Sequence, residues 1–266
     1  MSAKPPFLAL LALLHQAGLP AEQVQIPGPG GVTLNAAFVQ PDGAATEPAV
    51  VMLHGCGGPF PSRDVGWASV LVHAGHPILL PDSFGSRGMG SQCRVKERAV
   101  TASGLRRGDA IAAATWLAAR PGTPQGGIAL MGWSNGAITT LWTARTRADL
   151  PPGLFSRFVA FYPGCASVLR SASWQPSAPL LILIGDRDDW TPAPPCRDLA
   201  ARFPGQISLV TYPGAWHDFD APGLTFQTLN GLASTGSGTG TAHRGGDPAA
   251  REDAMQRVPR FLAAGP

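Results

Sequence analysis

The sequence Gly-Trp-Ser-Asn-Gly at residues 132–136 constrains the fold of this chain more than any other segment. The apolar residues 127–131 before it predict a short buried strand, and residues 137–145 after it can form a helix that packs against a sheet. A serine at a tight strand-to-helix turn has a strained backbone, and the flanking glycines remove side chains that would collide there. The pattern predicts a nucleophile elbow, in which Ser134 stands above the sheet edge and the Asn135 N–H faces developing negative charge. The alternative is a glycine-rich turn with an incidental serine.

Apolar runs and segments of helical pattern alternate along the chain from residue 49 onward. Such alternation predicts the α/β class, with a mostly parallel sheet and helices on both faces. The predicted strands are residues 24–26, 32–40, 49–53, 77–80, 127–131, 158–161, 179–184 and 207–212, and the predicted helices are residues 65–74, 101–119, 137–145, 195–203 and 249–263. Residues 22–266 are predicted to form a single domain. Residues 233–246, rich in Ser, Thr and Gly, are predicted to form a flexible loop.

A serine nucleophile needs a base, and the base needs an acid that orients it. The loops after parallel strands meet at one edge of a sheet, so the partners of Ser134 should follow strands. His217 is the only one of the six histidines that lies just after the last predicted strand of the sheet. The loop before that strand carries three candidate acids, Asp186, Asp188 and Asp189. The order serine, aspartate, histidine is that of the α/β-hydrolase fold.

Five short segments within residues 24–263 carry a family resemblance. They are His-Gly-Cys-Gly-Gly at 54–58, Asp-Ser-Phe at 82–84, the pentapeptide at 132–136, the loop 185–192 and the C-terminal helix. Together they resemble the dienelactone hydrolase family of the α/β-hydrolase superfamily. The family places its acid three residues after a glycine and four before a proline, which implies Asp188, with Asp189 as the second choice. The best-known members have a cysteine where this chain has Ser134, so the resemblance implies a general esterase-type hydrolase rather than an enzyme for dienelactone itself.

The resemblance also suggests how the reacting carbonyl would be held. Residues 54–58 are similar to an oxyanion-hole loop, in which the backbone N–H of Cys56 would act together with that of Asn135. The Cys56 thiol is a rival nucleophile, since cysteine–histidine hydrolases exist, but residues 54–58 do not form an elbow.

Side chains near the predicted reacting groups are candidates for substrate binding. The aromatic residues Trp133, Trp190, Trp216 and Phe219 could line an apolar acyl pocket, and their alternative is core packing. Arg87 and Arg94 could bind a substrate carboxylate, and their alternative is simple solvation.

Charge and cysteine spacing limit the partners of the protein. The net charge is only +3 and no basic run is present, so the sequence gives no case for nucleic acid and no nucleic-acid partner is expected. The cysteines have no C-x-x-C spacing and no histidine cluster accompanies them, so no metal is expected, and the predicted chemistry needs no organic cofactor. The expected partner is a small-molecule ester or lactone, and the sequence leaves the oligomeric state open.

Residues 1–21 are predicted to be a signal peptide. Lys4 supplies the positive charge, residues 7–14 form an apolar core, and Ala21 could end a cleavage site. The alternative is an apolar first helix of the folded protein. The segment is too short to span a bilayer. Cleavage would give a periplasmic or secreted protein, and without it the protein would be cytoplasmic.

Four cysteines allow three complete pairings. Cys56 and Cys93 follow strands at the predicted active-site edge, while Cys165 and Cys196 lie after two other neighbouring strands. Neighbouring strand ends are about 5 Å apart, so loops that leave them can come within disulfide distance. The hypothesis is therefore a Cys56–Cys93 and a Cys165–Cys196 disulfide, in keeping with the exported branch that the resemblance suggests. The alternative is four reduced thiols.

These observations predict a serine hydrolase that cleaves a carboxylic ester or lactone through an acyl-enzyme, with Ser134, Asp188 and His217 as its triad. A serine peptidase or amidase is an alternative, because the same triad cleaves amides. A catalytically silent binding protein with this fold is another.

Overall fold

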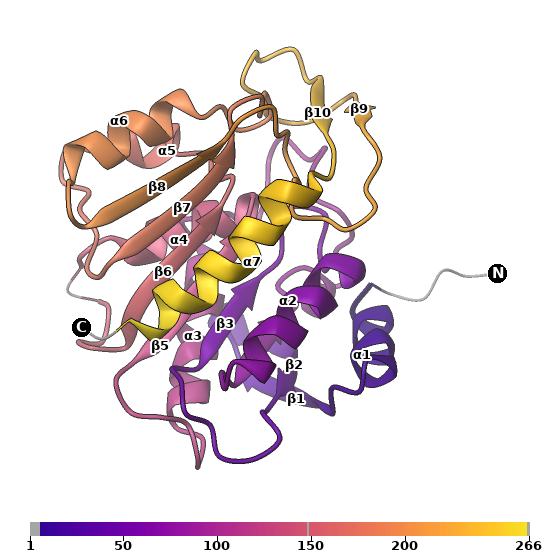
Figure 1. Cartoon of the computed structure of the whole chain (residues 1–266), viewed down its shortest axis with the longest axis vertical. Coiled ribbons are helices and arrows are strands. Elements are labelled where there is room, and N and C mark those ends of the chain that lie inside the picture. Colours follow the sequence, from indigo (N-terminus) through magenta and orange to yellow (C-terminus); the bar gives the residue numbers. More distant parts are fainter. Residues whose placement is uncertain (1–5, 148, 265–266) are drawn as a thin grey trace.

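The computed structural model describes residues 6–147 and 149–264, and these residues fold around one eight-stranded sheet (Figure 1). The strand order is β1-β2-β4-β3-β5-β6-β7-β8, and only β2 runs against the others. The strands are β1 Ala21–Pro27, β2 Thr33–Val39, β3 Val50–Leu53, β4 Ile78–Pro81, β5 Ile128–Trp133, β6 Phe155–Phe161, β7 Leu180–Gly185 and β8 Ile207–Tyr212. The predicted α/β-hydrolase fold with a mostly parallel sheet is confirmed.

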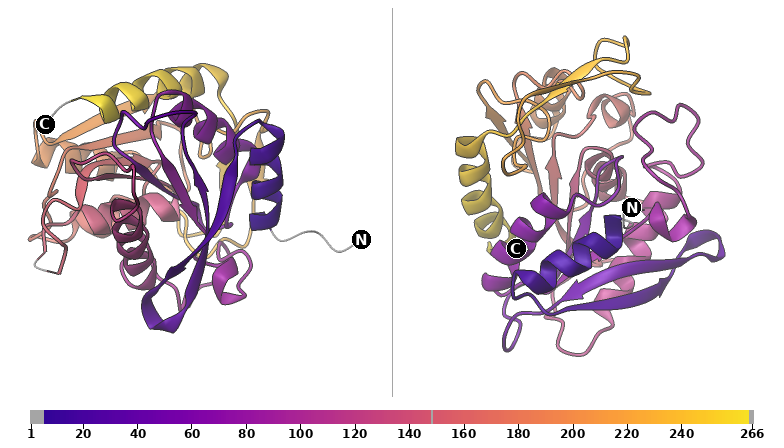
Figure 2. Two further views of the ribbon diagram at one scale, coloured as in Figure 1. Left: turned by 90° about the horizontal axis from the view of Figure 1, so that it is seen from below. Right: turned by 90° about the vertical axis from the view of Figure 1, so that its right-hand side faces the viewer.

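Helices cover both faces of the sheet. They are α1 Pro6–Gln16, α2 Pro61–His73, α3 Leu105–Ala118, α4 Asn135–Ala144, α5 Ala166–Leu169, α6 Pro194–Arg202 and α7 Pro248–Ala263, with the short 3₁₀ turns η1 Pro29–Gly31 and η2 Gly85–Arg87. Figures 1 and 2 show α1, α2 and α7 on one face, and α3 and α4 on the other. Because β3, β5 and β7 are covered from both sides, every residue in these strands is buried, which explains their unbroken apolar runs.

The first helix packs into the described fold. Phe7, Leu10 and Leu14 of α1 are buried, and the helix lies against α2. Ala21, the predicted cleavage position, is the first residue of β1 and pairs with Val39. The signal peptide at residues 1–21 stays a prediction, and its charged start, including Lys4, lies outside the described residues. In the described part of the chain no helix has the length and apolar character needed to cross a bilayer.

The predicted flexible loop at 233–246 contains a strand, so that prediction was wrong for its last part. β10 (Ala242–Arg244) pairs antiparallel with β9 (Gln227–Leu229), above the carboxyl ends of the large sheet (Figure 1). The side chain of His243 bonds to Asp189, which further holds the hairpin. A three-residue strand in a Gly-, Ser- and Thr-rich segment is too short to leave a hydrophobic pattern in the sequence.

Both predicted disulfides are present, Cys56–Cys93 and Cys165–Cys196. The first joins the loop after β3 to the loop after β4, and the second joins the segment after β6 to α6, which follows β7. β3 and β4 are neighbours in the sheet, as are β6 and β7, which is the reason that the paired loops meet. The Sγ of Cys56 is bonded to Cys93, so the rival assignment of the Cys56 thiol as nucleophile is excluded in this form of the protein. Two disulfides are compatible with export.

Thiol titration of the denatured, unreduced protein from an oxidising compartment is expected to find no free thiols. Each disulfide closes a loop, with sequence separations of 37 and 31 residues, and the chain-entropy model assigns such a loop about 3–4 kcal/mol of stability. Reduction should therefore lower the melting temperature. Peptide mapping that joined Cys56 to Cys165, or a titration that found four thiols, would contradict this pairing.

Candidate active site

Ser134 lies between the last residue of β5 and the first residue of α4, with a positive φ of 52°. The glycines around it are required by close backbone approach. A Cβ on Gly136 would collide with the carbonyl oxygen of Leu53, and a Cβ on Gly132 would lie 2.5 Å from the carbonyl carbon of Gly136. The turn therefore has the strained geometry of a nucleophile elbow.

His217 follows β8 and forms a buried hydrogen bond with Asp188, which follows β7. The His217 Nδ1 and Asp188 Oδ2 atoms are 2.7 Å apart. Asp188 also accepts hydrogen bonds from the backbone N–H groups of Trp190 and Thr191 and from the Thr191 hydroxyl, so its carboxylate is held in place. A carboxylate only accepts hydrogen bonds, so Nδ1 carries the proton and Nε2 of the neutral ring is left as an acceptor. That Nε2 is buried and has no hydrogen-bond partner among the described residues.

Of the two leading candidate acids, only Asp188 contacts His217. Asp189 points to the β9–β10 hairpin, where it accepts hydrogen bonds from the backbone N–H and the ring Nδ1 of His243. The carboxylate of Asp186 accepts a hydrogen bond from the N–H of Gly214. The three neighbouring aspartates thus have three different partners.

Two aromatic rings pack against the imidazole of His217. The Tyr162 ring centroid lies 4.5 Å from that of His217, and the Trp190 centroid lies 4.6 Å away. The Thr191 hydroxyl oxygen lies 2.9 Å from the carbonyl oxygen of Tyr162 and 3.2 Å from Nδ1 of His217. Packing and hydrogen bonds therefore fix the ring plane as well as its protonated nitrogen.

The pKa of His217 is set by two opposing influences. Burial is the larger single influence and lowers the pKa, because it disfavours the charged ring. The Asp188 carboxylate raises the pKa through its charge and its hydrogen bond, and Asp218 raises it further. The pKa of His217 consequently lies above its ordinary value of about 6.5.

The loop after β3 passes directly beside the serine. A Cβ on Gly55 would lie 3.6 Å from the Cβ of Ser134. Cys56, the next residue, is anchored through its carbonyl oxygen, which accepts a hydrogen bond from the N–H of Gln92, and through its disulfide. Within the described residues, the N–H groups of Cys56 and Asn135 have no hydrogen-bond acceptor, which leaves both available to a ligand.

His54, at the start of this loop, is a buried neutral histidine. Its Nδ1 donates to the carbonyl oxygen of Gly55, and its Nε2 accepts a hydrogen bond from the N–H of Ser83. Nε2 also lies 3.6 Å from Asp82, but an atom that accepts a hydrogen bond carries no proton, so the two residues form no ion pair. Burial, followed by the charge of Arg106, lowers the pKa of His54 well below its ordinary value, so the ring stays neutral.

Ser134, His217 and Cys56 line one cleft with a volume of about 240 Å³. The cleft is bounded by residues 55–60, Arg63, Cys93, Ser134, Trp190, His217, Asp218 and Arg244. Sequence analysis missed Arg63, Asp218 and Arg244. Asp218 lies between the two arginines, 3.8 Å from the Arg63 guanidinium and 3.5 Å from that of Arg244. Arg63 also pairs with Asp64.

Most of the predicted substrate-binding residues lie elsewhere, and only Trp190 lines the cleft. Trp133 is in the core, where it stacks on Phe161 and donates its indole N–H to Asp220. The guanidinium of Arg87 forms two hydrogen bonds with buried Asp109, so it is a structural ion pair.

The remaining candidates also have partners outside the cleft. Trp216 packs against Phe226 and His243 of the hairpin, and Phe219 is fully buried among aromatic rings. Arg94 donates a hydrogen bond to the carbonyl oxygen of Asn230. Trp216 and Phe219 therefore serve packing, and Arg94 holds a loop, so none of the three lines the cleft.

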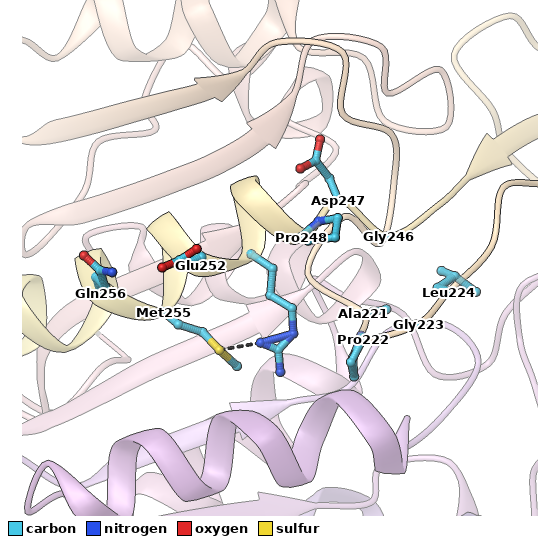
Figure 3. Close-up of a pocket in the computed structure, with 11 residues that line it drawn as sticks. Ala221, Pro222, Gly223, Leu224, Gly246, Asp247, Pro248, Glu252, Met255 and Gln256 are labelled. Atoms are coloured by element: carbon cyan, nitrogen blue, oxygen red, sulfur yellow. Dashed lines mark hydrogen bonds between the residues drawn. The ribbon is translucent and has the colours of Figure 1, made fainter.

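A second cavity, of about 500 Å³, lies beside the N-terminal half of α7 (Figure 3). It is lined by residues 221–224 and by residues of 246–256, and none of the predicted triad residues borders it. Arg251 and Met255 also line this cavity, and the Arg251 guanidinium contacts the Sδ of Met255. The smaller cleft, not this larger cavity, therefore contains the elbow serine.

The fold is similar to several solved hydrolase structures. A dienelactone hydrolase homologue from Klebsiella pneumoniae is 18% identical, with a TM-score of 0.69, and the match covers 92% of this chain and 98% of the other. An esterase from Pyrobaculum calidifontis is 19% identical, with a TM-score of 0.66 and coverage of 97% and 90%. A serine hydrolase without a lid from Xanthomonas campestris is 21% identical, with a TM-score of 0.61 and coverage of 92% and 97%. No curated protein matches the sequence.

The sequence itself matches a protein-family model. Residues 34–265, from β2 to beyond the end of α7, match the model of the dienelactone hydrolase family. The match confirms the resemblance carried by the motifs at residues 54–58 and 132–136 and supports a hydrolase function. The chain therefore belongs to the dienelactone hydrolase family.

Proposed function

We propose that this protein is a serine hydrolase that cleaves a carboxylic ester or lactone through an acyl-enzyme. The observation that carries the proposal is the arrangement in one cleft of Ser134 in a strained turn and His217 bonded to Asp188. The Nε2 of His217, which has no hydrogen-bond partner in the described part of the chain, is an available base on the side of the ring away from Asp188. Membership of the family supports the hydrolase class.

In the proposed reaction, the Oγ of Ser134 attacks the substrate carbonyl carbon while Nε2 of His217 takes the hydroxyl proton. The C–O bond of the ester then breaks, and the alcohol leaves with the proton that His217 returns to it. Water, deprotonated by His217, then attacks the acyl carbon. The bond from this carbon to Oγ of Ser134 breaks, His217 returns the proton to Oγ, and the carboxylic acid product leaves. Asp188 holds the ring and stabilises its charged form. The N–H groups of Cys56 and Asn135 would stabilise the oxyanion, each by roughly 3–4 kcal/mol in the transition state.

A fluorophosphonate probe separates an enzyme from a catalytically silent protein of the same fold. The proposal expects one label per chain, on Ser134, and no label on Ser134→Ala. Absence of labelling on folded protein would leave the silent binding protein as the better account. Matched ester and amide substrates distinguish an esterase from a peptidase or amidase, and the proposal expects turnover of the ester. A series of p-nitrophenyl esters of graded chain length then measures which acyl groups the cleft accepts.

The pH dependence of activity should report the raised pKa of His217. The base must be neutral, so kcat/KM should fall on acidification through one ionisation whose pKa lies above about 6.5. Rates measured from about pH 5 to pH 9 test this expectation. A midpoint well below 6.5 would contradict it.

The raised pKa of His217 also affects folding stability, and here the favourable effect is on the acidic side. A pKa that is raised in the folded protein contributes stability in full below the unfolded-state pKa, and this contribution is lost as pH rises through the folded pKa. Activity is therefore expected to appear over the pH range in which the charged His217–Asp188 pair stops stabilising the fold.

A further inference from the structure

Arg106, in the first turn of α3, is a buried cation behind the two loops that carry the proposed oxyanion donors. The residue is only 1% exposed. Its Nη1 donates to the side-chain Oδ1 of Asn135 at 2.6 Å, and its Nη2 donates to the carbonyl oxygen of His54 at 2.7 Å. One guanidinium thus connects the start of α4 to the end of β3.

Each of these acceptors is close in sequence to a donor of the proposed oxyanion hole. Asn135 supplies one N–H itself, and the His54 carbonyl is two residues before the Cys56 N–H. A guanidinium is planar and presents its N–H groups at fixed angles. It therefore fixes the spacing of the two loops, which a flexible or singly bonded side chain could not do.

Among the residues that the structure describes, no carboxylate contacts the Arg106 guanidinium. Both of its close acceptors are neutral, and its Nε is buried without a partner among the described residues. The nearest acids have other partners, since Asp109 is held by Arg87, and Asp82 accepts backbone hydrogen bonds. Burial lowers the pKa of Arg106 to about 10, so the group remains protonated at neutral pH.

We propose that Arg106 is a positioning residue for the oxyanion hole, which holds the Cys56 and Asn135 N–H groups in place and adds positive charge behind them. This inference rests on the proposed ester hydrolysis at Ser134. A group of this kind favours the transition state over the bound ester, because negative charge on the substrate oxygen develops only there.

The test compares Arg106→Met with Arg107→Met. Arg107 is the next residue on α3 and pairs with Asp149, away from the cleft, so it controls for loss of an arginine from this helix. For Arg106→Met we expect kcat on the fastest p-nitrophenyl ester to fall about 10- to 1000-fold, with KM little changed. Arg106→Lys should recover part of the loss, and Arg107→Met should retain wild-type kcat.

Two further measurements separate positioning from a general structural role. The acidic limb of the pH profile should keep its midpoint in Arg106→Met, because the main influences on the pKa of His217 are burial, Asp188, Asp218 and Arg63. Asn135→Ala removes the side-chain acceptor but keeps the backbone N–H. Its loss of kcat should be smaller than that of Arg106→Met, and the double variant should be no slower than Arg106→Met alone.

The outcomes are distinguishable from failure of the proposed function. If the wild-type protein is not labelled by the fluorophosphonate, the proposed function fails. If the wild-type protein is labelled and Arg106→Met keeps the wild-type kcat, the inference about Arg106 is wrong. The same holds if the substitution raises KM and leaves kcat unchanged. Should Arg106→Met fail to fold by circular dichroism, Asn135→Ala decides, and an unchanged kcat in that variant overturns the inference.

Discussion

Replacing Ser134 with alanine is expected to lower kcat for ester hydrolysis by roughly 10⁴- to 10⁶-fold. Its hydroxyl is the group that would form the acyl-enzyme, and the Cys56 thiol cannot replace it, since Cys56 is in a disulfide. Alanine keeps the Cβ and meets the same positive φ of 52° as serine, so folding should change little. Steady-state kinetics with the best p-nitrophenyl ester measures the loss.

Thermal unfolding and fluorophosphonate labelling are the controls for this variant. The alanine protein should unfold near the wild-type temperature and take no label, which ties the loss of rate to the hydroxyl. Retention of more than a tenth of the wild-type kcat would show that Ser134 is not the nucleophile.

The second large effect is expected for Asp188→Asn, with a loss of about 10⁴-fold in kcat. Asp188 accepts hydrogen bonds from His217, from two backbone N–H groups and from the Thr191 hydroxyl. An asparagine amide has one oxygen and one NH₂ group, so the NH₂ group must face some of these donors. The protonated Nδ1 of His217 then loses its acceptor, and the charged ring loses its negative partner. Asp189→Asn is the matched control, because its carboxylate bonds to His243 on the hairpin instead.

Kinetics of the two variants, measured side by side, decides the assignment of the acid. Asp189→Asn should lose no more than a few-fold in kcat. A large loss in Asp189→Asn together with near-normal Asp188→Asn would transfer the role to Asp189. Equal, large losses in both would point to collapse of the 185–192 loop, which circular dichroism and melting temperature would detect.

The central parts of the fold and site were predictable because their signals are local. The elbow needs glycines at 132 and 136, where backbone atoms come too close for a Cβ. His217 and Asp188 follow strands, and parallel strands bring such loops to one edge. The disulfide pairing followed from the same rule, since it depends on which strand ends are neighbours.

The rest of the cleft depends on contacts that no local pattern encodes. Trp133 is adjacent to Ser134 in sequence, but the strained turn raises the serine and leaves the tryptophan in the core. Arg244 reaches the cleft from a strand of only three residues. Arg63 and Asp64 are buried charges that pair with each other, and Arg63 also lies 3.8 Å from Asp218.

The Cys56–Cys93 disulfide has a practical consequence for anyone who produces this protein in a heterologous host. Cys56 is in the loop beside Ser134, and both half-cystines border the cleft. Material made in a reducing cytoplasm can contain a complete serine, histidine and aspartate and still lack the covalent anchor of that loop. Weak turnover by such a preparation would report its oxidation history and not its substrate preference. Substrate screens should therefore begin with protein folded under oxidising conditions, with its thiol content measured beforehand.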